Sequence, residues 1–248
     1  TPEMQAIMDE VTPLVTASSD EIFMNKAFFE RVSAVLADSA SLDREQYMVT
    51  KKLYDRFIDN GVALGEADQA RFKEISSELA VLTQKFGNNL LAESNAFKSE
   101  VGIPVSSYPV FMTMCEDRAR REAAFKAYSS RGNHDNANDN KQVILDTMRL
   151  RTEKAQLLGY NCAADQILND KMAHDHAAVD AFLDKIMVKA VAKAKEEVVS
   201  MQKLMDADVA AGLLPAGSKI QPWDWWYYSE KVRKAQYDLD ENVTKPYF

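Results

Sequence analysis

The sequence predicts an all-α protein, a multi-helix lobe organised around two long helices. Its 248 residues include only eight glycines and seven prolines, whereas residues that favour helices, such as Ala, Leu, Lys and Glu, are plentiful. Apolar side chains recur every three or four positions over two long stretches, roughly residues 67–97 and 176–211, which is the spacing of one helix face. Strand-like alternation is limited to a weak candidate at 217–221.

Three helices are expected in the first quarter of the chain. Residues 3–17 place their apolar side chains on one helical face, and Ser18-Ser19-Asp20 has the composition of a cap, so a second helix is expected to begin at Asp20. A third helix should run from a cap at 41–45 to Asn60-Gly61, where the glycine suits a helix C-terminus.

The longest regular pattern runs from about Ala67 to Phe97 and would span roughly 45 Å at 1.5 Å per residue. Such a stripe packs against neighbouring helices, so we interpret it as structural. Its apolar positions are Phe72, Ile75, Leu79, Leu82, Phe86 and Leu90.

The rest of the chain alternates predicted helices with breaks. Glycine and prolines at 101–109 interrupt the pattern, and helix should resume near Phe111 or Glu116. The later segments are a helix ending before Gly132, an Asn/Asp-rich loop at 134–140, a helix from Lys141 to Leu158 stopped by Gly159, and the second long helix from His176 to about Ala211.

The composition excludes several classes of partner. A net charge of −8 argues against a nucleic-acid binder, because phosphate contacts need clustered Lys and Arg. The densest basic cluster, Arg118, Arg120 and Arg121, lies among acidic residues and is expected to be a solvated helix face. No apolar run approaches the ~18–20 residues that a membrane span needs. Neither nucleic acid nor a membrane is therefore an expected partner.

The cysteines and the N-terminus say little about chemistry. Cys115 and Cys162 lie far apart without a C-x-x-C spacing, and we interpret both as buried thiols in helical surroundings. The chain begins with Thr1 rather than Met and shows no signal peptide, so an N-terminal segment is expected to have been removed. A cytoplasmic location is the expectation, with the periplasm left open.

The histidines do not form a recognisable metallopeptidase motif. The chain has three, His134, His174 and His176, and neither H-E-x-x-H nor E-x-x-H occurs. On a helix, His174 and His176 would point about 200° apart, so a capping or surface role is expected and zinc binding is the alternative. His134 lies in a polar loop and is expected to be solvated. These residues by themselves give no self-contained active site.

Four stretches in order resemble a known family. Leu82–Leu91 is similar to one of its helices, and Arg118–Gly132 resembles its Arg-x-x-Arg-Glu…Ala-Tyr…Arg-Gly segment. Arg149–Tyr160 ends in Leu-Leu-Gly-Tyr, and 221–248 contains Pro-Trp-Asp-Trp, Tyr-Tyr and a final Pro-Tyr-Phe. The family is the thimet oligopeptidase and peptidyl-dipeptidase family of zinc metallopeptidases. The motifs at 221–248 most resemble its bacterial dipeptidyl carboxypeptidase branch.

The resemblance implies an all-helical, two-lobed zincin-type peptidase with a deep channel for short peptides. Zinc would be held by two histidines of H-E-x-x-H and a later glutamate, and the motif's own glutamate would activate water. In the family this motif follows the Pro-Tyr-Phe stretch, so none of those ligands can be assigned to residues 1–248. We expect this chain to be a fragment, inactive and without stoichiometric zinc.

The resemblance also implies a domain division. Residues 1–219 would be the helical lobe, shortened around 101–109 relative to the family, and 220–248 would lead toward the missing catalytic domain of the same protein. The intact protein would hydrolyse short peptides, releasing C-terminal dipeptides. The alternative is a non-catalytic helical module that binds peptides or proteins on the retained scaffold.

The aromatic segment at 220–248 contains all three tryptophans, at 223, 225 and 226. If it were helical, Trp223 would share a face with Trp226 or Tyr227, and burial against the two long helices is the simpler interpretation. The alternative is that Asp224 or Tyr228 faces the substrate channel. These two residues are the only candidates for a substrate-channel site.

Overall fold

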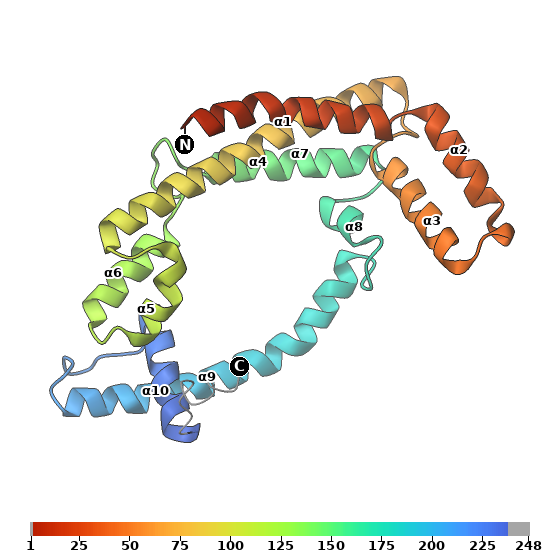
Figure 1. Cartoon of the computed structure of the whole chain (residues 1–248). Coiled ribbons are helices and arrows are strands. Elements are labelled where there is room, and N and C mark those ends of the chain that lie inside the picture. Colours follow the sequence, from red (N-terminus) through yellow and green to blue (C-terminus); the bar gives the residue numbers. More distant parts are fainter. Residues whose placement is uncertain (1, 238–248) are drawn as a thin grey trace, which may run out of the picture. The chain divides into compact units, whose positions relative to one another are not determined.

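A computed structural model describes residues 2–237 and confirms an all-α fold. The described residues form ten α-helices and three short 3-10 turns, with no strand among them (Figure 1). The contacts divide the chain into two compact units, Thr1–Asn89 with Asp139–Ala178 and Leu90–Asn138 with Val179–Phe248. The final Pro-Tyr-Phe, at 246–248, lies outside the described residues.

In the first unit, three helices lie side by side: α1 (Pro2–Phe23), the first part of α4 (Glu66–Val101) and α7 (Lys141–Leu157) (Figure 1). Gln84 of α4 hydrogen-bonds Asp9 of α1. The Nε of Arg71 lies 2.6 Å from Glu153 Oε1 and ties α4 to α7. Gly159, with φ +87°, follows the end of α7 as predicted.

The helices α2 (Lys26–Ala37) and α3 (Arg44–Asp59) pack against each other in the same unit. Phe57 is fully buried between them, and the ring of Phe28 meets it edge-on at 5.1 Å. The expected helix start at Asp20 is wrong, because α1 continues to Phe23. The cap is Asn25 instead, whose side chain accepts a hydrogen bond from Phe28 N at 3.0 Å.

The first unit also contains the short helix α8 (Ala163–Leu168) and the first residues of α9 (His176–Ala210). The apolar spacing predicted two long helices, and the structure confirms both. The first, α4, has 36 residues and the second, α9, has 35.

The second unit contains the end of α4, the turn η2 (Val105–Ser107), α5 (Tyr108–Met114) and α6 (Arg118–Ser129). Phe97, Tyr108, Met112 and Ala124 form a buried cluster, and the Tyr108 ring stacks on Tyr128 with centroids 3.9 Å apart. Helix resumes at Tyr108, earlier than expected. Pro109 permits this because it occupies the first turn, where its missing N–H is not needed.

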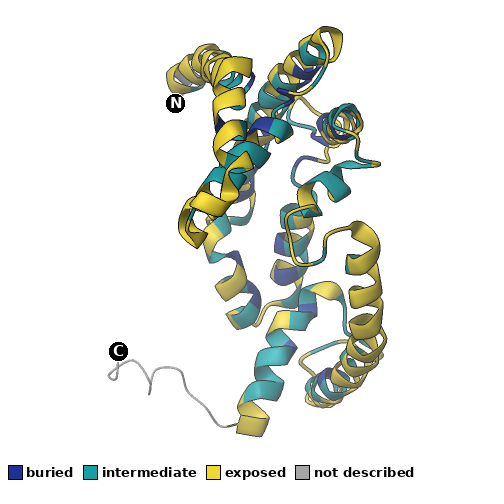
Figure 2. Ribbon diagram, turned by 90° about the vertical axis from the view of Figure 1, so that its right-hand side faces the viewer, coloured by how far each residue is buried: buried dark blue, intermediate teal, exposed yellow. Residues whose placement is uncertain are grey.

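The rest of the second unit holds the remainder of α9, the turn η3 (Pro222–Asp224) and α10 (Trp225–Tyr237). Met201 and Met205 of α9 are buried with Tyr228 of α10. Exposed residues run along much of the helical surface (Figure 2), including apolar side chains such as Phe182 at 61% exposure. No helix in the described part is long and apolar enough to cross a membrane.

Candidate functional site

Asp224, one of the two sequence candidates, lies fully buried in the second unit. The turn η3 directs its carboxylate inward, and Gln221 N donates a hydrogen bond to Asp224 Oδ2 at 3.1 Å. The Gln221 carbonyl in turn accepts from Asp224 N at 2.9 Å. Pro222 opens this 3-10 turn, a position that suits its fixed φ.

Two arginines of α6 converge on that carboxylate. Arg118 Nη2 lies 2.8 Å from Asp224 Oδ2, and Arg121 Nη2 lies 2.9 Å from Oδ1. Arg121 also donates to the carbonyls of Cys115 and Glu116, at 2.7 and 3.1 Å. We call Arg118, Arg121 and Asp224 the arginine–carboxylate cluster. Such pairing offsets the cost of burying charge.

The expectation of a solvated basic face is wrong for Arg121, whose side chain is 1% exposed. Arg118 is partly exposed, at 25%, and its hydrogen bonds to Asp224 raise its pKa. Arg120 alone of the three is exposed. Arg118 and Arg121 share a helix face because they are three residues apart. That spacing indicates that the two arginines lie together, but it does not indicate that they are buried.

Tyr228, the other candidate, is also buried, at 1% exposure. Its hydroxyl donates to Asp208 Oδ2 at 2.8 Å, and Lys231 Nζ lies 2.7 Å from the same oxygen. Burial would raise the pKa of Asp208, but these two hydrogen bonds bring it below its usual range. Burial and the bond to Asp208 raise the pKa of Tyr228. The phenol therefore stays a neutral donor.

The two candidates meet through their neighbours. The guanidinium of Arg121 lies over the ring of Tyr227, 4.2 Å from its centroid. Tyr227 and Tyr228 are in edge contact at 5.2 Å. Asp224 and Tyr228 thus secure one segment at two points, on α6 and on α9. This arrangement supports the interpretation that the segment is buried against other helices, and a channel-facing role for either residue stays a prediction.

Of the two predicted pairings of Trp223, the one with Trp226 is not formed. Trp223 packs near Phe125, with centroids 6.2 Å apart, whereas Trp226 meets Tyr108 at 6.2 Å. The prediction applied to one continuous helix. In the structure Trp223 lies in a 3-10 turn and Trp226 lies in α10, so the two side chains point in different directions. Trp226 is 42% exposed. The indole Nε1 of Trp223 is buried and has no hydrogen-bond partner among the described residues.

His134 is not simply solvated, contrary to expectation. Its Nδ1 lies 2.6 Å from Glu93 Oε2, and its Nε2 lies 2.8 Å from Ser130 Oγ. Ser130 Oγ also donates to the Lys126 carbonyl at 2.8 Å, so the serine acts as part of a helix end. Burial would raise the pKa of Glu93, but hydrogen bonds from Asn136, Gly132 and His134 together lower it.

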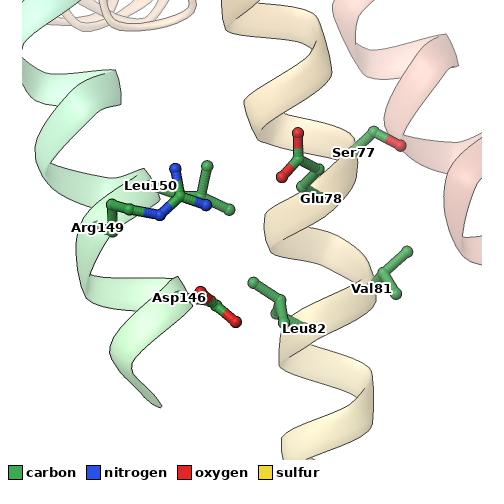
Figure 3. A pocket seen from close by; sticks show the side chains of 7 residues that line it. All are labelled: Ser77, Glu78, Val81, Leu82, Asp146, Arg149 and Leu150. Atoms are coloured by element: carbon green, nitrogen blue, oxygen red, sulfur yellow. The ribbon is translucent and has the colours of Figure 1, made fainter. Parts of the chain in front are cut away.

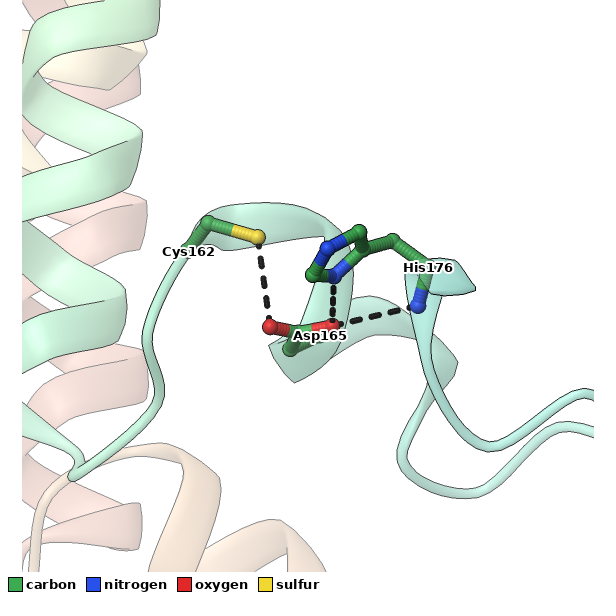
Figure 4. Close-up of side chains that lie close together, drawn as sticks. All are labelled: Cys162, Asp165 and His176. Atoms are coloured by element: carbon green, nitrogen blue, oxygen red, sulfur yellow. Dashed lines mark hydrogen bonds and ion pairs between the residues drawn. The ribbon is translucent and has the colours of Figure 1, made fainter. Parts of the chain in front are cut away.

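Another cluster lies in the first unit, where α8 approaches the start of α9. Cys162, Asp165 and His176 place one ligand atom each within 4.8 Å of the others (Figure 4). His174, two residues before His176, is exposed and has a φ of +65°. The two cysteines are unpaired and half-buried rather than buried. Both occupy cap positions of helices: Cys115 follows the last residue of α5, and Cys162 precedes the first residue of α8.

An open groove lies between α4 and α7, with a volume of about 370 Å³. Figure 3 shows Glu78 and Leu82 facing Asp146, Arg149 and Leu150 across it. The acidic and basic groups pair along these helices: Glu78 lies 3.5 Å from Arg71, and Arg149 lies 3.8 Å from Glu153. We assign no ligand to the groove.

Residues 111–248 match the model of Peptidase family M3. A dipeptidyl carboxypeptidase from Escherichia coli (strain K12) is 30% identical, over 99% of this chain and 40% of the relative. An oligopeptidase A from Haemophilus influenzae is 26% identical, over 99% of this chain and 41% of the relative. Saccharolysin from Saccharomyces cerevisiae is 27% identical, over 86% of this chain and 34% of that protein. The chain thus spans about two fifths of the length of these relatives or less.

Proposed function

Since this chain belongs to peptidase family M3, we propose that it is part of a zinc-dependent peptidase that hydrolyses short peptides. The observation that carries the proposal is the match of residues 111–248, which includes both the arginine–carboxylate cluster and the aromatic segment. The 30% identity to a dipeptidyl carboxypeptidase over 99% of the chain supports a finer statement. The whole protein would release dipeptides from the C-termini of its substrates.

The residues of this chain do not fit the expected catalytic zinc centre. That centre takes two histidines of H-E-x-x-H and a third ligand, and the three histidines here, at 134, 174 and 176, have no such spacing. We therefore derive no hydrolytic step from this chain. Its part in the proposed activity is to supply helical walls that admit short peptides and exclude folded proteins.

We propose that Asp224 and Tyr228 act on the channel by fixing its wall. Both side chains are buried and hydrogen-bonded, so the surface that they control is the exposed side of the aromatic segment, including Trp226. In the whole enzyme, Tyr228→Phe should raise KM for short peptides with little change in kcat. Unchanged values of both would show that Tyr228 does not support the channel wall.

A binding module without catalysis is the second candidate. It is favoured by the exposed apolar side chains along α9, which include Phe182, Leu183, Ile186 and Met187, because such surfaces mark contact sites. The coding sequence downstream of Phe248 separates the two candidates. An H-E-x-x-H motif there supports the peptidase, and a stop codon directly after Phe248 supports the module.

The purified 248-residue chain provides the direct test of how the activity is divided. We expect it to leave short peptides intact, whereas the whole protein cleaves them and loses activity with a zinc chelator. Chelator-sensitive release of dipeptides by the 248-residue chain alone would contradict the proposal.

A further inference from the structure

We propose that Cys162, Asp165 and His176 form a binding site for one transition-metal ion, with Zn²⁺ the best fit. This site is separate from the catalytic zinc centre proposed for the whole protein. It also departs from the sequence-based expectation that this chain holds no stoichiometric zinc. The proposal rests on the geometry of three different ligand types from two helix ends.

Helix positions bring the three ligands together. Cys162 is the N-cap residue of α8, and Asp165 lies three residues later in its first turn, so both side chains lie on one face. The loop between α8 and α9 returns His176, the first residue of α9, to the same place. All three residues belong to the first compact unit.

The distances suit a single ion. Cys162 Sγ lies 3.4 Å from Asp165 Oδ2, and His176 Nδ1 lies 2.6 Å from Asp165 Oδ1. Zinc bonds of about 2.0–2.3 Å in a tetrahedron separate neighbouring ligands by roughly 3.3–3.7 Å. The sulfur–oxygen distance already falls in that range. The histidine contacts the other carboxylate oxygen, so the carboxylate would rotate to present one oxygen to a single ion. The nitrogen–oxygen pair is closer because a proton now joins it, and it would open by about 1 Å once an ion replaced that proton.

The donor set selects the class of metal. A thiolate and an imidazole nitrogen favour Zn²⁺ and other late first-row ions, whereas Mg²⁺ and Ca²⁺ prefer oxygen ligands. Figure 4 shows the cysteine thiol and the histidine ring hydrogen-bonded to Asp165, and a bound ion would take the place of the protons in these bonds.

An ion can reach the site from solvent. The side chain of His176 is 53% exposed and that of Asp165 is 14% exposed, and Cys162 is half-buried. Three protein ligands leave one position of a tetrahedron for water. The Asp165 carboxylate already links α8 to the first turn of α9 by accepting a hydrogen bond from His176 N at 3.2 Å. A bound ion would strengthen this link.

Cobalt provides the test, since Co²⁺ bound to a thiolate gives a charge-transfer band in the near ultraviolet. The 248-residue chain, freed of metal and kept reduced, is titrated with Co²⁺ and then with Zn²⁺. We expect the band to saturate at one ion per chain, Zn²⁺ to abolish it, and protons to be released on binding.

Matched variants locate the site. Cys162→Ser should lose the band, and His176→Ala should lose stoichiometric metal. Cys115→Ser and His174→Ala should behave as the unaltered chain. Serine is a favourable N-cap and Cys162 makes no side-chain cap bond, so Cys162→Ser should fold normally by circular dichroism. Absence of the band in the unaltered chain would overturn the proposal. Equal metal content in the Cys162→Ser/His176→Ala double variant would overturn it as well.

Discussion

Asn in place of Asp224 should release the aromatic segment from α6. The carboxylate receives only donors: Arg118 and Arg121 on Oδ1, and Arg118 and Gln221 N on Oδ2. An amide puts its own NH₂ against one of these groups, whichever way it is turned. The change also leaves the charge of Arg121 unpaired at 1% exposure.

The magnitude follows from that burial. Removing one partner of a buried ion pair costs about 3–5 kcal/mol, and the carbonyls of Cys115 and Glu116 that stay bonded to Arg121 place the expected cost near the lower end. Arg118→Met should cost less, about 1 kcal/mol, because Arg118 is 25% exposed. Arg120→Met, on the exposed side of the same helix, is the matched control and should change stability by less than about 0.5 kcal/mol.

The chain contains its own probe for this assay, because its three tryptophans all lie at 223–226. Urea unfolding followed by tryptophan fluorescence therefore reports on this segment, while circular dichroism follows the helices as a whole. In Asp224→Asn the fluorescence transition should move to lower urea. It should also precede the loss of circular dichroism.

A double-variant cycle tests the reasoning behind the magnitude. Arg121→Met combined with Asp224→Asn should cost less than the sum of the single changes, by about 2–3 kcal/mol, because no unpaired buried charge is left. If the costs add, or if Asp224→Asn resembles Arg120→Met, the arginine–carboxylate cluster does not hold the segment.

Three further predictions concern other groups of the second unit. Tyr228→Phe should cost about 1–2 kcal/mol in urea unfolding, since Asp208 loses the hydroxyl and keeps Lys231; no change would exclude that bond as a support. The free energy of unfolding of Trp223→Phe should stay within about 1 kcal/mol of that of the unaltered chain, because the indole N–H that it removes is buried without a partner among the described residues. A larger loss would contradict this reasoning. Glu93 has a lowered pKa, so its stabilisation should be complete above the unfolded-state pKa of about 4.3 and disappear as the pH falls through the lower folded-state value. Glu93→Gln should reduce this acid-side loss in unfolding series between about pH 5 and pH 3, and an unchanged pH dependence would contradict it.

Long helices and their ends were largely readable from the sequence. The apolar spacing over 67–97 and 176–211 continues for many turns, and α4 and α9 form there. Gly159 marked the end of α7 because the positive φ it adopts is unfavourable for other residues. Ser18-Ser19-Asp20 was misleading because three cap-forming residues can also continue a helix. The structure places the break at Asn25, whose side chain makes the capping bond.

The site residues were harder to predict, because their partners are distant in the sequence. Arg121 and Asp224 are separated by 103 residues, and the local composition around Arg121 is that of an exposed helix. Glu93 and His134 are separated by 41 residues. Only the fold brings these groups together, so charge patterns read locally could not separate a buried ion pair from a solvated one.

The peptidase proposal itself is tested most directly by identifying the products of the whole protein. An N-acetylated tetrapeptide is incubated with it, with and without a zinc chelator, and the products are identified by mass spectrometry. The account predicts an intact C-terminal dipeptide as the released product and no release with the chelator. An uncleaved tetrapeptide, or cleavage that the chelator leaves unchanged, would contradict it.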